Sequence, residues 1–198
     1  MTGTILYYAR AVDGTMLVAL SAIASDQADP TKNTMKRAKL FLDYAASHPD
    51  AILTFSSSNM VLCVHSDASY LTEPKSRSRA GGHFFMSDNS DNPKNNGDVL
   101  NIAQIIKAVM SSAAEAEIGA LYLNSRQAIP ARTCIIKMGH LQPPTPVQTD
   151  DMTALCFVLK NLQLKATKSI DMKFWWMRCR AAQQQFRYYL GAGKFNPI

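Results

Sequence analysis

The chain has 198 residues, of which 47% are hydrophobic and 18% are charged, a composition typical of folded globular proteins and not of disordered ones. Its formal net charge is +6, and the positive excess lies entirely after residue 58. Such an excess suits a polyanion such as nucleic acid, although a solvated basic surface explains it equally well. No apolar run reaches the about 18–20 residues of a membrane helix, and no secretory signal is seen. We therefore expect an intracellular protein, cytoplasmic or nuclear, not secreted and without a membrane partner.

The segment before residue 59 is expected to be helical. Apolar residues predict two short helices, over residues 5–12 and 16–24, joined by an Asp-Gly turn. A longer amphipathic helix then opens with Pro30 near its first turn and carries Met35 and Leu42 on its apolar side. It stops at the Ser-His-Pro-Asp run that follows, because proline does not continue a helix.

A change of pattern follows this helix. Residues 51–55 predict a strand, and the polar run 56–59 predicts a turn or a short linker. We place a domain boundary there. A helical extension, residues 1–58, precedes it, and a strand-led domain, residues 59–198, follows it.

The second part of the chain alternates strands and helices. Strands are expected over residues 60–64, 81–86, 99–110, 146–150 and 185–190. Helices are expected over residues 113–127, 128–139, 152–159 and 169–184. Polar loops, residues 71–79 and 87–97, connect the first three strands, so that the sheet begins with antiparallel hairpins. The expected class is α/β, a mixed sheet with flanking helices.

Three acidic residues occupy similar places in this pattern. Asp67 follows the first strand, Asp150 ends the fourth, and Glu117 lies one turn into the helix that begins after Ser112. If the strands are neighbours and the helix packs on them, the three carboxylates converge. Hard cations such as Mg²⁺ prefer carboxylate oxygens, and a pair of such ions promotes phosphodiester hydrolysis. The plainer interpretation is two turn aspartates and an unrelated glutamate on a helix face.

Other metal chemistry is not indicated by the sequence. The four cysteines form no C-x-x-C pair, and the histidines show no metal-ligand spacing. We therefore expect no zinc site and treat the histidines as structural.

Four short motifs follow one another along the second part of the chain. They are SDASY at 66–70, SSAAEAE at 111–117, QTD at 148–150 and KSIDMKF at 168–174. In this order and at these separations they resemble the ribonuclease H domain of copia-type retrotransposon polyproteins. The likeness runs from Asp67 to Lys194. Residues 1–58 resemble the end of the reverse-transcriptase region of such polyproteins.

The resemblance implies a fold, an activity and a set of site residues. The fold would be a ribonuclease H-like mixed five-stranded sheet flanked by helices. The activity would be hydrolysis of the RNA strand of RNA–DNA hybrids with two Mg²⁺ or Mn²⁺ ions, and the remainder of the pol polyprotein would be a further partner. Asp67, Glu117 and Asp150 would be the catalytic metal ligands. Glu117 fits the family pattern better than Glu115, because Ile-Gly-Ala follows it.

Basic residues would hold the hybrid by its phosphates, with little dependence on sequence. The candidates are Lys75, Arg77, Arg79, Lys168, Lys173, Arg178 and Arg180. A solvated surface explains the same residues equally well.

Two departures from the family lead to the alternative function. The family's fourth carboxylate, which follows the last strand, has no counterpart before Ile198, so the domain looks C-terminally truncated and the second ion poorly held. The paired aspartates of a polymerase are missing from residues 1–58, so no polymerase activity is expected. The alternative is therefore a catalytically weak or inactive nucleic-acid-binding remnant of the same element.

Overall fold

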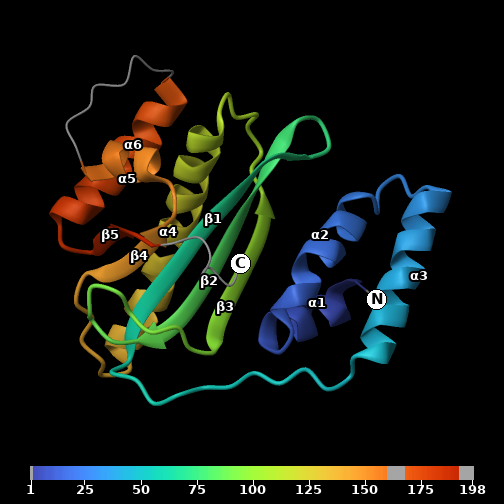
Figure 1. Ribbon diagram of the computed structural model, residues 1–198, viewed down its shortest axis with the longest axis horizontal. Helices are drawn as coiled ribbons and strands as arrows, with labels where there is room; N and C mark the ends of the chain where they lie inside the picture. The colour runs from blue at the N-terminus through green and yellow to red at the C-terminus, as the bar shows by residue number, and fades with distance from the viewer. Residues whose placement is uncertain (1, 160–167, 192–198) are drawn as a thin grey trace. The chain divides into compact units, whose positions relative to one another are not determined.

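The structure is a computed structural model that describes residues 2–159 and 168–191. It divides into two compact units, Met1–Thr54 and Phe55–Ile198. The first unit contains α1 (Thr2–Ala11), the short 3-10 helix η1 (Gly14–Met16), α2 (Leu17–Ser25) and α3 (Lys32–Ser47) (Figure 1). The helices expected in this segment are therefore present.

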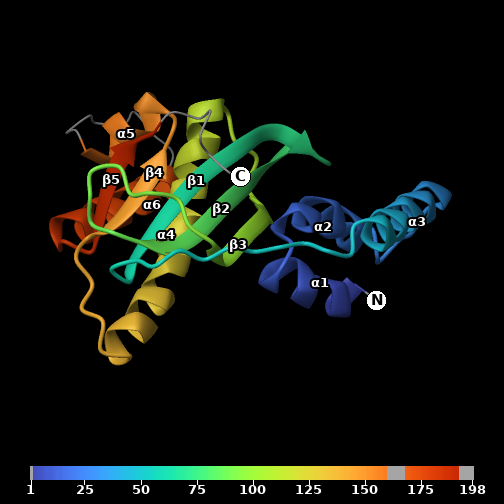
Figure 2. The same cartoon turned by 60° about the horizontal axis from the view of Figure 1, so that its bottom comes forward.

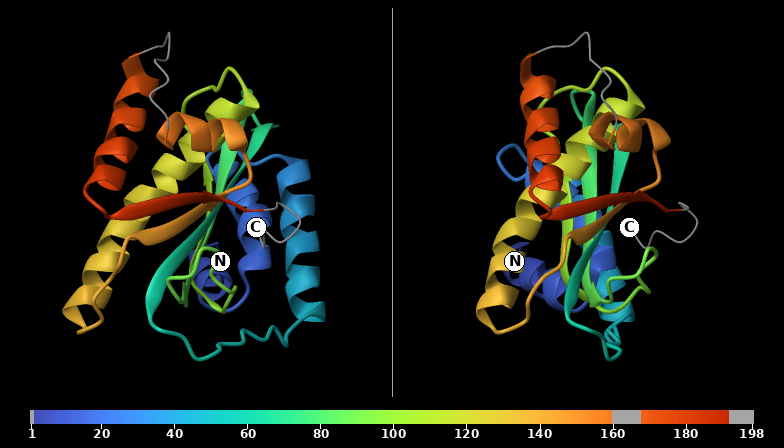
Figure 3. Two further views of the ribbon diagram at one scale, coloured as in Figure 1. Left: turned by 60° about the vertical axis from the view of Figure 1, so that its left-hand side comes forward. Right: turned by 90° about the vertical axis from the view of Figure 1, so that its left-hand side faces the viewer.

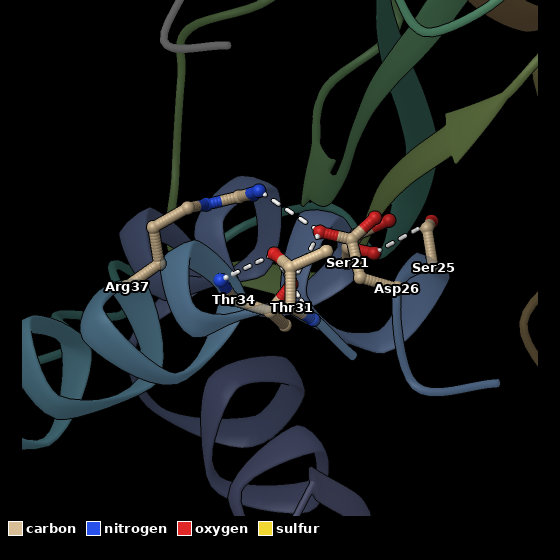
Figure 4. Close-up of polar contacts among 6 residues, drawn as sticks. All are labelled: Ser21, Ser25, Asp26, Thr31, Thr34 and Arg37. Atoms are coloured by element: carbon tan, nitrogen blue, oxygen red, sulfur yellow. Dashed lines mark hydrogen bonds and ion pairs between the residues drawn. The ribbon is translucent and has the colours of Figure 1, made fainter. Parts of the chain in front are cut away.

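Polar side chains fix the connection between α2 and α3 (Figure 4). Thr31 caps α3 by accepting a hydrogen bond from the backbone N–H of Thr34 at 3.2 Å, and Thr34 Oγ1 accepts one from the N–H of Thr31. This capping box satisfies two donors that the first turn of a helix leaves free. Asp26 pairs with Arg37 at 3.1 Å and also accepts from Thr34. The helix therefore starts after Pro30, not around it.

Two expectations for the first unit are wrong. Met35 is 70% exposed and Leu42 is 40% exposed, whereas Phe41 is buried. The buried side of α3 is thus rotated away from Met35 and Leu42, toward Phe41 and the first-turn residue Thr34. Residues 51–55 form no strand; Ile52 is 87% exposed, and an isolated segment has no partner to complete its backbone hydrogen bonds.

The second unit is built on a five-stranded sheet in the order β3-β2-β1-β4-β5 (Figures 1 and 2). Its strands are β1 (Val61–Glu73), β2 (Arg77–Ser87), β3 (Asp98–Ile105), β4 (Thr145–Thr149) and β5 (Phe186–Leu190). β1 pairs antiparallel with β2, and β2 with β3, while β4 runs parallel to both β1 and β5. The expected mixed sheet with an antiparallel start is confirmed.

Three helices share one core with the sheet. They are α4 (Ala113–Lys137), α5 (Met152–Leu159) and α6 (Lys168–Ala182). α4 lies along β1 and β2, and α6 contacts α4 (Figure 3). The buried core contains Leu62, Val64, Phe84, Ile118, Leu121, Val147, Val158, Met177 and Phe186. None of the helices in the described part of the chain is long and apolar enough to cross a membrane.

Side chains alternate along a strand, so every second residue of β1 faces the side of the sheet opposite the core described above. Cys63 packs there with Val61 and Phe85 in a second buried cluster. His65 lies next to this cluster with its ring edge-on to Phe85, 4.7 Å between centroids. His83 stacks on Phe85, and its two ring nitrogens each lie 3.0 Å from an asparagine Oδ1.

The β1–β2 hairpin is longer than the sequence indicated. The segment predicted as a polar loop, residues 71–79, instead contains the end of β1, a short turn and the start of β2. One of its charged residues has a partner across the hairpin, because Arg79 pairs with Glu73 at 2.7 Å. β3 is shorter than expected and ends at Ile105, where the backbone N–H of Ile106 bonds Ser78 O.

A single helix replaces the two helices expected between 113 and 139. α4 continues through Pro130, which has no N–H to donate. Ala128 is fully buried, and Ile129, Ala131 and Ile135 pack against the core around the proline. These apolar contacts on both sides of Pro130 outweigh the one lost hydrogen bond, so the helix does not break.

Replacing Pro130 with alanine is expected to stabilise the protein by about 1–3 kcal/mol, because the missing hydrogen bond and the ring clash are both relieved. The measurement is the free energy of unfolding in urea. Thr133→Ala, at an exposed site one turn later on the same helix, is the control and should change stability by only a few tenths of a kcal/mol. An unchanged or lower stability of Pro130→Ala would mean that α4 is adapted to the proline.

Candidate metal centre

Asp67 is held inside β1, and not at its end as expected, because the hairpin continues beyond it. It stands opposite Gly81 of β2 in the strand register. The side chain is half-buried, and Oδ1 accepts a hydrogen bond from the backbone N–H of Ala68 at 2.8 Å. Burial raises the pKa of Asp67; the Ala68 N–H offsets part of this rise, and the charge of Asp150 adds to it.

Glu117 reaches the same backbone N–H from the helix side. Ser112 caps α4 by accepting from the N–H of Glu115 at 3.2 Å, which sets Glu117 one turn into the helix. Glu117 is only 7% exposed, and its Oε1 accepts from Ala68 N–H at 3.0 Å. Glu115 turns away and accepts from the N–H of Ser111 at 2.7 Å. The two glutamates therefore have different partners, and only Glu117 faces Asp67.

The start of β4 is fixed against β1 by a side chain. The Gln142 amide accepts from Leu62 N–H at 2.9 Å and donates to Met60 O at 2.7 Å, as a neighbouring strand would. Arg132 of α4 donates to Gln142 O at 2.6 Å and to Thr145 Oγ1 at 3.0 Å. These bonds hold the start of β4 beside β1 and against α4, and they help to set the position of the residue that follows β4.

Asp150 is that residue, and its side chain is exposed. Its neighbour Asp151 is engaged elsewhere, because its Oδ1 accepts from Ala154 N–H at 2.8 Å at the start of α5. Of this acidic pair, Asp150 therefore turns toward the other carboxylates.

The three carboxylates come together at one point. Asp67, Glu117 and Asp150 each offer an oxygen, and these atoms all lie within 4.8 Å of one another. Burial raises the pKa of Glu117 to about 8, and the charges of Asp67 and Asp150 add to the rise. Like charges this close favour the neutral form of one member until a cation balances them.

This donor set fits a hard divalent cation. Three carboxylate oxygens without sulfur or imidazole suit Mg²⁺ or Mn²⁺. Glu117 Oε2 is buried and has no hydrogen-bond partner among the described residues. A buried carboxylate oxygen of this kind is costly unless it binds a proton or a cation. The geometry therefore supports a metal centre and not three independent polar residues.

The basic residues of the hairpin are placed differently from one another. Lys75 is exposed in the turn, and Arg77 is half-buried. Arg79 is 5% exposed, pairs with Glu73 and donates to Ala103 O at 3.1 Å. The Arg79 guanidinium therefore stabilises the hairpin and is not placed to bind phosphates.

The basic residues of α6 lie among aromatic rings. Lys173, Arg178 and Arg180 are partly exposed, and the side chain of Lys168 lies outside the described part. The Arg178 guanidinium carbon lies 4.3 Å from the centroid of the Phe174 ring, and the exposed Trp175 is a further neighbour at 5.8 Å. The Nε of Arg178 also donates to Val158 O at 3.3 Å, so this guanidinium is held by α5 as well as by the aromatic rings.

One residue near the site was overlooked in the sequence. Asn124 is fully buried on α4, and its Nδ2 donates to Ser66 Oγ at 2.9 Å and to Gly81 O at 2.7 Å. Its spacing was the available signal, since it lies two helical turns after Glu117 and so on the same face. Without the strand register, that spacing indicates only a buried helix position.

The fold matches that of ribonuclease H. The structure is similar to LC11-RNase H1, isolated from compost by a metagenomic approach, with a TM-score of 0.51 and 10% identity over 69% of this chain and 88% of that one. A second structure of LC11-RNase H1, in complex with an RNA/DNA hybrid, gives a TM-score of 0.48 and 11% identity over 69% and 88%. The N-terminal ribonuclease H domain of rv2228c from Mycobacterium tuberculosis gives 0.45 and 16% over 69% and 86%. No protein-family model and no curated protein matches the chain. The ribonuclease H-like fold expected from the sequence is thus confirmed.

Proposed function

We propose that this chain is a ribonuclease H-type endonuclease that hydrolyses the RNA strand of RNA–DNA hybrids by two-metal-ion catalysis. We further propose that it derives from the pol polyprotein of a copia-type retrotransposon. Residues 1–58 would be the end of the reverse-transcriptase region, and the remainder of the polyprotein would be its natural partner. The origin is supported by the order and spacing of the four sequence motifs.

The observation that carries the proposed activity is the convergence of Asp67, Glu117 and Asp150 on a ribonuclease H-like fold. These residues come from a strand, a helix and the end of a second strand, and they are far apart in the sequence. Rigid elements thus present three hard ligands at one point, an arrangement suited to catalysis by positioning.

The residues have separable tasks in this proposal. Asp67, Glu117 and Asp150 would hold the divalent cations through their carboxylate oxygens. When bound, such ions supply Lewis-acid stabilisation of the charge that develops on the phosphate during hydrolysis. The Ala68 N–H holds one oxygen of Asp67 and one of Glu117, which fixes their orientation before any ion binds.

The hybrid would be held through its phosphates by the basic residues that remain accessible. These are Lys75 and Arg77 on the hairpin and Lys173 and Arg180 on α6, whereas Arg178, whose Nε donates to Val158 O, is a candidate from the sequence. Lys168 stays a candidate from the sequence. Phosphate contacts position a duplex without reading its sequence, so we expect cleavage with little sequence preference.

The alternative is a binding remnant that hydrolyses little or nothing. It predicts binding of the hybrid that weakens steeply with added salt, as phosphate contacts do, with no cleavage at any salt concentration.

The proposal is tested by incubating the protein with a hybrid labelled separately on each strand, in Mg²⁺ or Mn²⁺. We expect cleavage of the RNA strand alone, and loss of about 1,000-fold or more in rate for Asp67→Asn, since ion-mediated stabilisation amounts to several kcal/mol. Asp29→Asn, an exposed aspartate in the first unit, is the matched control and should cleave as the parent does.

Absence of cleavage by a folded parent protein, with salt-dependent binding of the hybrid, would overturn the catalytic proposal and leave the binding remnant. Equal cleavage by the parent and Asp67→Asn would show that the activity does not come from these carboxylates. Duplex DNA and duplex RNA serve as substrates that should stay intact.

A further inference from the structure

Asn124 occupies a junction of three elements beside the carboxylates. Its amide group bonds a side chain of β1, Ser66 Oγ, and a backbone carbonyl of β2, Gly81 O. Asn124 and Ser66 are both fully buried. A buried amide held in this way fixes the relative position of all the elements it joins.

The two bonded positions are the immediate neighbours of Asp67. Ser66 precedes Asp67 in β1, and Gly81 is the register partner of Asp67 in β2. Asn124 itself lies two turns after Glu117 on the buried face of α4. The same side chain therefore connects the helix that carries one carboxylate to the strand that carries another.

The fit around Asn124 is close. A Cβ built on Gly82 would lie 2.3 Å from Asn124 Oδ1 and 3.0 Å from the Phe84 ring. Glycine at position 82 is thus required for the amide to reach β1 and β2 together. A residue larger than glycine at position 82 would push α4 away from the sheet at this point.

We propose that Asn124 is the positioning residue of the candidate metal centre: by tying α4 to β1 and β2, it sets Glu117 against Asp67 at the distance a shared cation needs. The Ala68 N–H, which bonds both carboxylates, is the first anchor between helix and strand, and Asn124 is the second, two turns away. Two separated anchors remove the pivoting of α4 that one anchor permits. This inference rests on the proposed function for its catalytic consequence.

The chain offers a matched control at the next residue. Ser125 is also fully buried on α4, and its hydroxyl bonds Tyr188 on β5 at 3.0 Å. Ser125→Ala therefore removes a buried hydrogen bond between the same helix and the same sheet, on a strand that carries none of the three carboxylates. Asn124→Leu keeps the approximate volume and removes the amide. Ser66→Ala, which removes only one of the two bonds, is the milder second variant if Asn124→Leu does not fold.

The test measures Mn²⁺ affinity by calorimetry, hydrogen exchange at the Ala68 amide, and kcat and KM on a hybrid. Loss of a group that orients metal ligands lowers metal affinity by about 10- to 100-fold, and we expect this for Asn124→Leu, with kcat reduced and KM for the hybrid unchanged. The Ala68 amide should exchange about fivefold faster or more. Ser125→Ala should lose stability while keeping Mn²⁺ affinity and kcat.

The inference would be overturned if Asn124→Leu, or Ser66→Ala in its place, had the same Mn²⁺ affinity and the same Ala68 exchange rate as the control Ser125→Ala. Asn124 would then be a stabilising contact only. A parent protein that neither binds Mn²⁺ nor cleaves would instead overturn the proposed function. The Ala68 exchange rate, which needs no metal, would still decide whether Asn124 aligns the helix with β1.

Discussion

Glu117→Gln is expected to make the metal-free protein more stable at pH 8.5 while abolishing cleavage. The folded-state pKa of Glu117 is about 8, above its unfolded value of 4.5. Between these values the folded state binds the extra proton, so the parent loses stability as pH rises from about 4.5 to about 8. A shift of this size corresponds to a few kcal/mol. Glutamine is neutral throughout and avoids this loss.

The measurement is the free energy of unfolding of both proteins in a chelator, at pH 4.5 and at pH 8.5. The two should be similar at the lower pH and differ by a few kcal/mol at the higher pH. Added Mn²⁺ should stabilise the parent more than the variant. Glu115→Gln, which alters a half-exposed glutamate on the same helix, should show no gain at pH 8.5. A Glu117→Gln variant less stable than the parent at pH 8.5 would contradict the buried, repulsive environment described above.

His65→Phe is expected to protect the protein against mild acid. Burial lowers the pKa of His65 from 6.5 to about 4, and the neighbouring His83 adds to this effect. The unfolded state therefore binds a proton that the folded state does not, and stability falls as pH drops from about 6.5 to about 4. The loss is about 3 kcal/mol. Neither ring nitrogen of His65 has a hydrogen-bond partner among the described residues, so phenylalanine fits without leaving a polar group unpaired.

The readout is the difference between the pH-stability curves of parent and variant, because Glu117 acts in the opposite direction over part of the same range. The stability of the variant minus that of the parent should increase by about 3 kcal/mol between pH 7 and pH 4. His140→Gln, at an exposed histidine, should follow the parent at every pH. Parallel curves for parent and His65→Phe would show that His65 titrates alike in the folded and unfolded states.

The sequence predicted the elements that depend on local pattern. The two short helices of the first unit, α5, β5 and the mixed sheet follow from apolar periodicity and from turn residues, and they were found close to their expected positions. The carboxylate cluster was predictable in outline, because the end of β4 and the cap of α4 are local features, although Asp67 was placed wrongly at the end of its strand. The short distance between the three carboxylates could not be predicted, since their separation of at most 4.8 Å depends on packing between distant segments.

The failures share one cause, which is that distant contacts override local preference. Pro130 breaks an isolated helix but not one with buried neighbours on both sides. The segment 71–79 looks like a polar loop until Arg79 meets Glu73 across the hairpin. The same pairing removes Arg79 from the basic surface. Residues 51–55 have the composition of a strand but no neighbour to pair with.

The attachment of β4 to β1 has a consequence for the order in which the molecule assembles. Gln142 bonds Leu62 and Met60 across 80 and 82 residues, whereas β1, β2 and β3 join through hairpins. Closing a long loop costs more entropy and slows folding, so we expect the three-stranded meander to form before β4 docks. Asp150 then reaches the other carboxylates only when β4 docks. A kinetic intermediate of this protein would have most of its sheet but no affinity for a divalent ion.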